Sequence, residues 1–249
     1  MASATTIFIF ILGSILGSFY NVVIYRLPKK ISIAKGTSFC PTCHHRVNPI
    51  DLIPILSYLM LKGKCRHCHQ PISPRYPLIE SLTGLSFVLV TLQYGISTFS
   101  LIGFALASIC IIIAMIDIDT MEIYDRFHVM IFILGLIVLM ISPLSWIDHV
   151  IGFFIISVPF LIIAITTNGI GGGDIKLVAV AGLLLGYQSM VVAFVIASVL
   201  AGAVALVLLV TKQVNRKSLI AFGPYLSFAI VIAYLYGNQL WNWYIQFYR

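Results

Sequence analysis

The sequence is poor in charge: 9% of its 249 residues are Asp, Glu, Lys or Arg, against about 25% in soluble domains. Hydrophobic residues make up 60%, and the mean hydropathy is +1.05. The shortage of charge excludes a small soluble fold and a disordered chain and indicates an integral membrane protein. Acids are scarcest, with 8 Asp and Glu against 15 Lys and Arg. Because the basic residues lie in loops beside apolar runs, they predict contact with anionic lipid and not with nucleic acid.

Several other patterns are missing. No basic residue precedes the first apolar run, Ile7–Phe19, and the nearest ones follow it. This order is the reverse of a cleavable signal peptide, so we expect a retained helix with its N-terminus outside. The sequence has no repeat of fixed period and no low-complexity segment. It also has no strand-bounded glycine fingerprint of a Rossmann-like cofactor domain.

Long apolar runs predict the fold class, an all-α polytopic membrane protein with about eight transmembrane helices. Pro28 should end the first of them. The run 175–211 is too long for one crossing and should break near Gly186. The expected spans are 5–25, 78–96, 98–117, 127–143, 149–167, 175–190, 191–211 and 219–237.

The long hydrophilic segment 27–77 divides the chain. We expect a domain 1–77, made of the first helix and a cytoplasmic loop, and a domain 78–249, a transmembrane bundle. With the N-terminus outside, 14 of the 15 Lys and Arg lie in cytoplasmic segments and only Arg249 lies outside. The aromatic run Trp241–Tyr248 is expected to form an interfacial belt. The cytoplasmic segments would be 26–77, 117–126, 168–176 and 212–218.

Two CxxC pairs lie in the basic loop, and Cys110 lies alone in an apolar run. Disulfides are rare in the cytoplasm, and two such knuckles are typical of a closed, structural Zn²⁺ site. The alternative is redox-active CxxC chemistry, but without a bound metal the loop would have no core to stabilise its fold. Cys110 should be a small buried hydrophobe. The expected zinc ligands are Cys40, Cys43, Cys65 and Cys68, with His44, His45, His67 and His69 as spare donors.

Two acids stand at the expected membrane edge. Asp117 closes an apolar run, and Asp174 follows the glycines Gly171–Gly173, which permit close backbone approach. Acids in such places are costly and usually functional. Two neighbouring carboxylates that share a proton can activate water and protonate a leaving amine, as aspartic proteases do. Two alternatives stay open: Asp174 as a helix cap, and Asp119 in place of Asp117.

The segment Gly171-Gly-Gly-Asp174 resembles the GxGD signature of intramembrane aspartic proteases. Together with Ile116–Met121 and both CxxC pairs, it resembles the bifunctional type IV prepilin peptidases. The resemblance covers nearly the whole chain in order. It departs at Tyr124, where relatives commonly have Pro before the Asp, and this should loosen the turn. Further matching segments are Gly17–Pro28, Gly63–Cys65 and Pro74–Glu80.

The resemblance implies cleavage of the basic leader of a prepilin or pseudopilin, after a Gly at the cytoplasmic membrane face. It also implies N-methylation of the new N-terminus by S-adenosylmethionine. Asp117 and Asp174 match the catalytic aspartates, and Gly63 and Lys64 match the part associated with methyl transfer. The implied location is a bacterial inner or plasma membrane. The implied substrate is a pilin of a pilus, secretion or competence system. Small residues such as Ala197–Ala205 permit close approach of its apolar helix, although packing within the bundle is the favoured role for them.

Two other functions were weighed against this one. A transporter or channel would bind a cation at Asp117 and Asp174, but inverted hydropathy repeats are missing. A thiol oxidoreductase would use the CxxC pairs without zinc. The pattern leaves the roles of four polar residues open. They could anchor a helix, or they could contact the substrate, the cofactor or the two aspartates. These residues are Asn21, Arg26, Glu80 and Lys176.

Overall fold

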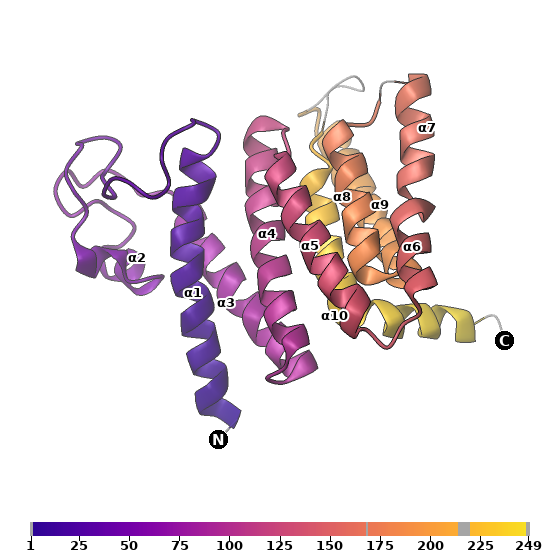
Figure 1. Cartoon of the computed structure of the whole chain (residues 1–249). Helices are drawn as coiled ribbons and strands as arrows, with labels where there is room; N and C mark the ends of the chain where they lie inside the picture. Colours follow the sequence, from indigo (N-terminus) through magenta and orange to yellow (C-terminus); the bar gives the residue numbers. More distant parts are fainter. Residues whose placement is uncertain (1, 168, 214–219, 248–249) are drawn as a thin grey trace. The chain divides into compact units, whose positions relative to one another are not determined.

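A computed structural model describes residues 2–167, 169–213 and 220–247 (Figure 1). Several predictions lie outside these described residues. They concern residue 168, the basic residues Arg216 and Lys217 of the last cytoplasmic segment, and the terminal Tyr248 and Arg249.

The described chain is mainly helical, as expected. A helix occupies each of the eight predicted spans. Four helical segments are long and apolar enough to cross a membrane within the described residues: Ala4–Arg26, Thr98–Thr120, Trp146–Thr167 and Tyr187–Val210. The other four spans remain predictions. The elements in order are α1 (Ala2–Arg26), η1 (Pro49–Leu52), α2 (Leu56–Met60), α3 (Arg75–Tyr94), α4 (Thr98–Thr120), α5 (Asp125–Ile141), α6 (Trp146–Ile155), α7 (Ser157–Thr167), α8 (Gly172–Leu185), α9 (Tyr187–Val210) and α10 (Gly223–Gln246).

Local sequence explains where the helices end. α1 stops at Arg26, ahead of Pro28, and α8 gives way to α9 at Gly186, whose φ of 77° suits glycine. Both ends were predicted. The expected span 149–167 is instead two helices that meet at Ile156. Pro159 lacks the N–H that would bond back to Ile155 and its ring crowds that carbonyl, which accounts for the break.

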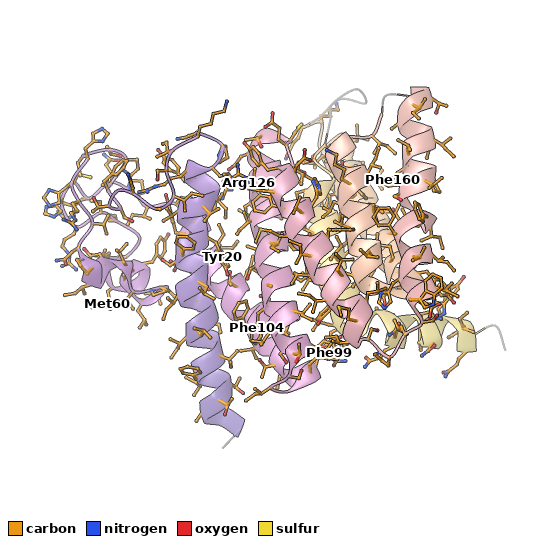
Figure 2. The ribbon with its side chains drawn as sticks, in the orientation of Figure 1. Tyr20, Met60, Phe99, Phe104, Arg126 and Phe160 are labelled. Atoms are coloured by element: carbon orange, nitrogen blue, oxygen red, sulfur yellow. The ribbon has the colours of Figure 1, made fainter. Side chains whose placement is uncertain are left out.

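The chain packs as two compact units, Met1–Ser108 and Ile109–Arg249. In the first, α1 lies against α3 at glycines that remove side chains from the contact. A Cβ on Gly17 would lie 2.8 Å from the Cα of Glu80, and one on Gly13 would lie 2.9 Å from the Cα of Gly84. The hydroxyl of Tyr20, labelled in Figure 2, donates to Ser108 Oγ at 2.8 Å. These contacts hold α1, α3 and the first part of α4 together.

In the second unit α8 is the central helix. It packs against α5, α6, α7, α9 and α10, and every residue from Leu177 to Leu185 is buried. Gly152 of α6 and Gly182 of α8 bring the two backbones into direct contact. His149 of α6 bonds through Nδ1 to the carbonyl of Leu183 at 2.8 Å. The helix whose first turn contains Asp174 is therefore held by five neighbouring helices.

Candidate active site and metal centre

Asp117 lies in the last turn of α4 and is 5% exposed. Its Oδ2 accepts a hydrogen bond of 3.0 Å from the backbone N–H of Gly223, the first residue of α10. The first N–H groups of a helix have no partner within it and carry partial positive charge, so this helix end favours a carboxylate. A Cβ on Gly223 would lie 2.5 Å from Asp117 Oδ2. Glycine at this position is what allows the contact.

Asp174 lies in the first turn of α8, whose N-cap is Gly171. The carboxylate is therefore past the cap position, contrary to the alternative in which it is a simple helix cap. Its Oδ1 is buried and has no hydrogen-bond partner among the described residues. A buried polar atom without a partner is uncommon and calls for an explanation, such as a catalytic role.

The two carboxylates line one cavity of about 300 Å³. Its walls come from two loops, the one after α4 and the glycine run before α8. Asp119 is exposed and is not among the lining residues, whereas Glu122 is. The full lining is Asp117, Met121, Glu122, Ile123, Tyr124, Gly171, Gly172, Gly173 and Asp174. The arrangement brings together the two acids that the sequence singled out and leaves Asp119 outside.

The backbone before α5 is one that proline could also adopt. Tyr124 has φ −75°, within the range that proline would impose, and it is the N-cap of α5. The guanidinium of Arg126 lies 5.8 Å from the centre of the Tyr124 ring. The departure from the family pattern is thus compatible with the same local backbone.

Side chains at the start of α5 hold the glycine run in place. His128 Nε2 lies 3.0 Å from the carbonyl oxygen of Gly173, directly before Asp174. Lys176 Nζ donates to Asp125 Oδ1 at 2.7 Å, and this hydrogen bond lowers the pKa of Asp125. Lys176 therefore pairs with an acid on α5 and not with the two cavity carboxylates.

The four expected metal ligands converge. The sulfur atoms of Cys40, Cys43, Cys65 and Cys68 all lie within 4.8 Å of one another. The Sγ atoms of Cys40 and Cys68 are 3.8 Å apart, which is about the edge of a tetrahedron with Zn–S bonds of about 2.3 Å. Backbone N–H groups of Cys43 and Thr42 lower the pKa of the Cys40 thiol to about 6, which favours a thiolate ligand. These residues fit a tetrahedral Zn²⁺ site.

The two knuckles are built alike. In the first, Cys40 N–H donates to the His45 carbonyl, and in the second, Cys65 N–H donates to the Gln70 carbonyl. His44 and His69, which follow each second cysteine, have φ of 56° and 55°. The backbone of these two histidines forms the turns of the knuckles. Their imidazole rings are not needed as metal ligands.

Gly63 and Lys64 lie directly before the second knuckle. Gly63 has φ 68°, and a Cβ there would lie 2.9 Å from the Tyr58 hydroxyl, so glycine is needed for the turn itself. Lys64 is exposed and pairs with Pro71 in an isolated β-bridge. A role for these two residues in cofactor binding remains a prediction.

The polar residues around the end of α1 have structural partners. Arg26 donates to the carbonyls of Ser32, Lys35 and Thr37 at 2.9, 2.7 and 3.3 Å, and so organises the chain that leaves α1. Asn21 donates to the Tyr76 carbonyl at 3.3 Å.

Sequence reasoning missed two contacts at the cavity, those made by Gly223 and His128. Gly223-Pro224 at the start of an apolar run is a typical helix start and was the available signal for the first. No local pattern connects His128 with Gly173, because the two residues are far apart in the chain.

Comparisons with known proteins place the chain. The family model of the bacterial peptidase A24 N-terminal domain matches residues 11–94, and that of the type IV leader peptidase family matches residues 104–206. The prepilin leader peptidase/N-methyltransferase of Bacillus subtilis (strain 168) is 37% identical over 96% of this chain and 97% of the relative. Proteins of the same name from Neisseria gonorrhoeae and Aeromonas hydrophila are 33% and 30% identical, over 94% and 95% of this chain and 93% and 92% of theirs.

No solved structure matches the chain significantly. The family matches and these relatives, aligned over nearly their whole length, agree with the resemblance noted from the motifs. The chain therefore belongs to the type IV leader peptidase family, together with the prepilin leader peptidase/N-methyltransferases.

Proposed function

We propose that this membrane enzyme removes the leader of type IV prepilins or pseudopilins and then methylates the new N-terminus. The observation that carries the peptidase half is the cavity that Asp117 and Asp174 share. Family membership supports both halves. The cut would fall after a glycine at the cytoplasmic membrane face of a bacterial inner or plasma membrane, with the N-terminus of the chain outside.

Hydrolysis in this site needs one charged and one protonated carboxylate. The unprotonated carboxylate takes a proton from a water molecule while the oxygen of that water attacks the carbonyl carbon of the scissile bond. The protonated one then supplies the proton to the amide nitrogen as the C–N bond breaks. Asp174 lies in the first turn of α8, whereas Asp117 faces the first N–H of α10 but lies in the last turn of α4, so helix ends of opposite polarity act on Asp117. The hydrogen bond from Gly223 favours the charged form of Asp117, whereas the unpartnered Oδ1 suits a protonated Asp174.

The rim of the cavity complements a basic leader. Glu122 lines the cavity and is exposed, so its carboxylate would attract the Lys and Arg residues ahead of the cleaved bond. The apolar helix that follows in a prepilin would pack within the bilayer.

Methyl transfer is assigned to domain 1–77 and peptide cleavage to domain 78–249. In support of this division, the four cysteines lie in the first compact unit and both cavity acids in the second. S-adenosylmethionine would supply an electrophilic methyl group. Lys64 has an exposed ammonium that suits the carboxylate of this cofactor, and the Cys₄ site would hold a structural Zn²⁺.

The direct test uses the full-length protein in nanodiscs, a full-length pseudopilin and S-adenosylmethionine with a deuterated methyl group. Intact mass spectrometry should show loss of the leader, followed by addition of one labelled methyl group at the new N-terminus. Cation flux in proteoliposomes with an intact pseudopilin would instead support a transporter and would contradict this function.

Replacing Gly223 with Ala should reduce leader cleavage about 100-fold, the effect expected from about 1 Å of misplacement in an active site. The added Cβ would lie 2.5 Å from Asp117 Oδ2, so the carboxylate or the start of α10 must move. Initial rates of pseudopilin cleavage measure the effect. The matched control is Gly172→Ala, also in the cavity wall, where a Cβ meets no atom within 4 Å. Equal rates in both variants would contradict the role given to Gly223.

A further inference from the structure

The loop between α1 and α3 exposes an apolar surface within a hydrophilic segment. Exposed fractions reach 64% for Leu59 and 74% for Met60. Met60 is labelled in Figure 2. These fractions equal or exceed those of Ile7 (60%) and Phe8 (64%) on the membrane-spanning helix α1. Six side chains of η1, α2 and the link between them form this surface, called here the apolar cluster: Ile50, Leu52, Ile53, Leu56, Leu59 and Met60. So many exposed apolar side chains within eleven residues, 50–60, indicate an interaction site.

A carboxylate on α3 fixes the position of the apolar cluster along the axes of α1 and α3. Glu80 Oε2 accepts a hydrogen bond of 2.7 Å from the backbone N–H of Ile55, which directly precedes α2. Glu80 lies five residues into α3, about 7.5 Å along its axis. Accordingly, α2 lies level with the middle of α1 and not beyond its cytoplasmic end (Figure 1). The apolar cluster is therefore held alongside α1, within the length of that helix.

The backbone at this tether is strained. Ile55 has φ 63° and ψ −53°, and the N–H of Leu56 donates to the carbonyl of Pro54 at 2.5 Å, which defines a γ-turn of the uncommon positive-φ type. A β-branched residue rarely adopts this conformation, and it persists only where surrounding contacts hold it. Glu80 provides such a contact. The contact with α3 therefore holds the apolar cluster in a defined position.

Charge around the apolar cluster selects its partner. Residues 26–77 contain nine Lys and Arg and one acid, Asp51. Asp51 is already paired with Arg66 through contacts of 2.6 to 3.2 Å, which connect η1 to the second cysteine knuckle. Lys62 and Lys64 directly follow the apolar cluster and are exposed. Apolar side chains bordered by basic ones suit the headgroup and acyl boundary of an anionic bilayer.

We propose that the apolar cluster inserts into the cytoplasmic interface of an anionic bilayer, with Lys62 at the level of the lipid phosphates. Five residues of helix are too few to span a membrane, so α2 lies in the interface and does not cross it. Through the Asp51–Arg66 pair, the inserted segment holds the four-cysteine site at the membrane surface. This inference does not depend on the enzymatic activity.

The test places the photo-crosslinker p-benzoylphenylalanine at position 60 of the full-length protein in nanodiscs of phosphatidylglycerol and phosphatidylethanolamine. Irradiation should give a lipid adduct on the peptide that contains residue 60, detected by mass spectrometry. The matched control carries the crosslinker at Gln70, an exposed position of the second knuckle, and should give no lipid adduct. Substituting phosphatidylcholine for phosphatidylglycerol, or adding Lys62→Gln, should lower the yield at position 60 several-fold.

Equal lipid adducts at positions 60 and 70, or none at either, would overturn the proposal. So would an adduct at position 60 formed only with added pseudopilin, since this surface would then dock substrate. The zinc content of each labelled protein shows whether the loop has folded, so an unfolded variant is recognised and replaced with the crosslinker at Leu59.

Discussion

Asp117→Asn abolishes leader cleavage, with an expected rate loss of about 10²–10⁴-fold or more, the usual contribution of a general acid or base. The substitution is nearly isosteric. Its amide oxygen can still accept the hydrogen bond from Gly223, so the end of α10 keeps its partner. What is lost is the ability to exchange a proton with water or with the leaving amine. Asn at this position therefore removes the chemistry and keeps the packing.

Asp119→Asn is the matched control, because Asp119 lies two residues away, is exposed and does not line the cavity. It should cleave at close to the wild-type rate. Single-turnover cleavage of a pseudopilin in nanodiscs measures both variants, with expression and thermal unfolding recorded for each. If Asp119→Asn lost cleavage and Asp117→Asn kept it, the first catalytic acid would be misassigned.

Cys65→Ser should eliminate bound zinc and methylation while leader cleavage continues. The four sulfurs are close enough for one tetrahedral ion, and a hydroxyl is a poor replacement for a thiolate ligand. In a loop with so little core, the free energy of metal binding serves as folding free energy, so the knuckles lose their structure with the metal. The cavity acids belong to the other compact unit, Ile109–Arg249.

Metal analysis and intact mass of the pseudopilin product report the two effects separately. Cys110→Ser is the control, because Cys110 is buried and is not one of the four clustered cysteines, so it should leave zinc and methylation unchanged. A metal-free Cys65→Ser protein that still methylates would reject the structural role of zinc. Loss of both activities would reject the division between domains 1–77 and 78–249.

Most of the helix pattern follows from the sequence, because apolar run length and local breakers determine it. Pro28 and Gly186 mark real helix ends. The break at Ile156 had its signal in Pro159, which was outweighed by the continuous apolar run around it. The last helix, expected over 219–237, continues to Gln246 and takes in the aromatic residues Trp241 and Trp243, since aromatic composition does not itself end a helix.

The candidate site was less predictable than the fold. Asp117 and Asp174 stand out because acids beside apolar runs are costly, and the cysteines stand out through their spacing. No pattern in the sequence identifies the residues that contact them. Gly223 lies 106 residues from Asp117, and Ile55 lies 25 residues from Glu80. Such contacts depend on how the helices pack, which composition and periodicity leave undetermined.

The length of α8 has a consequence for how water and substrate would reach the two acids proposed as catalytic. Its 14 residues span about 21 Å, whereas the hydrocarbon core of a bilayer is about 30 Å thick. If α8 crosses the bilayer upright, as predicted for the span 175–190, the helix would be about 9 Å shorter than the hydrocarbon core is thick. Because other helices surround α8, protein and not lipid fills this difference. If part of this difference in length falls at the Asp174 end of α8, Asp174 lies below the membrane surface. A recessed, hydrated entrance is then required, and an extended stretch of substrate must enter it before it can be cut.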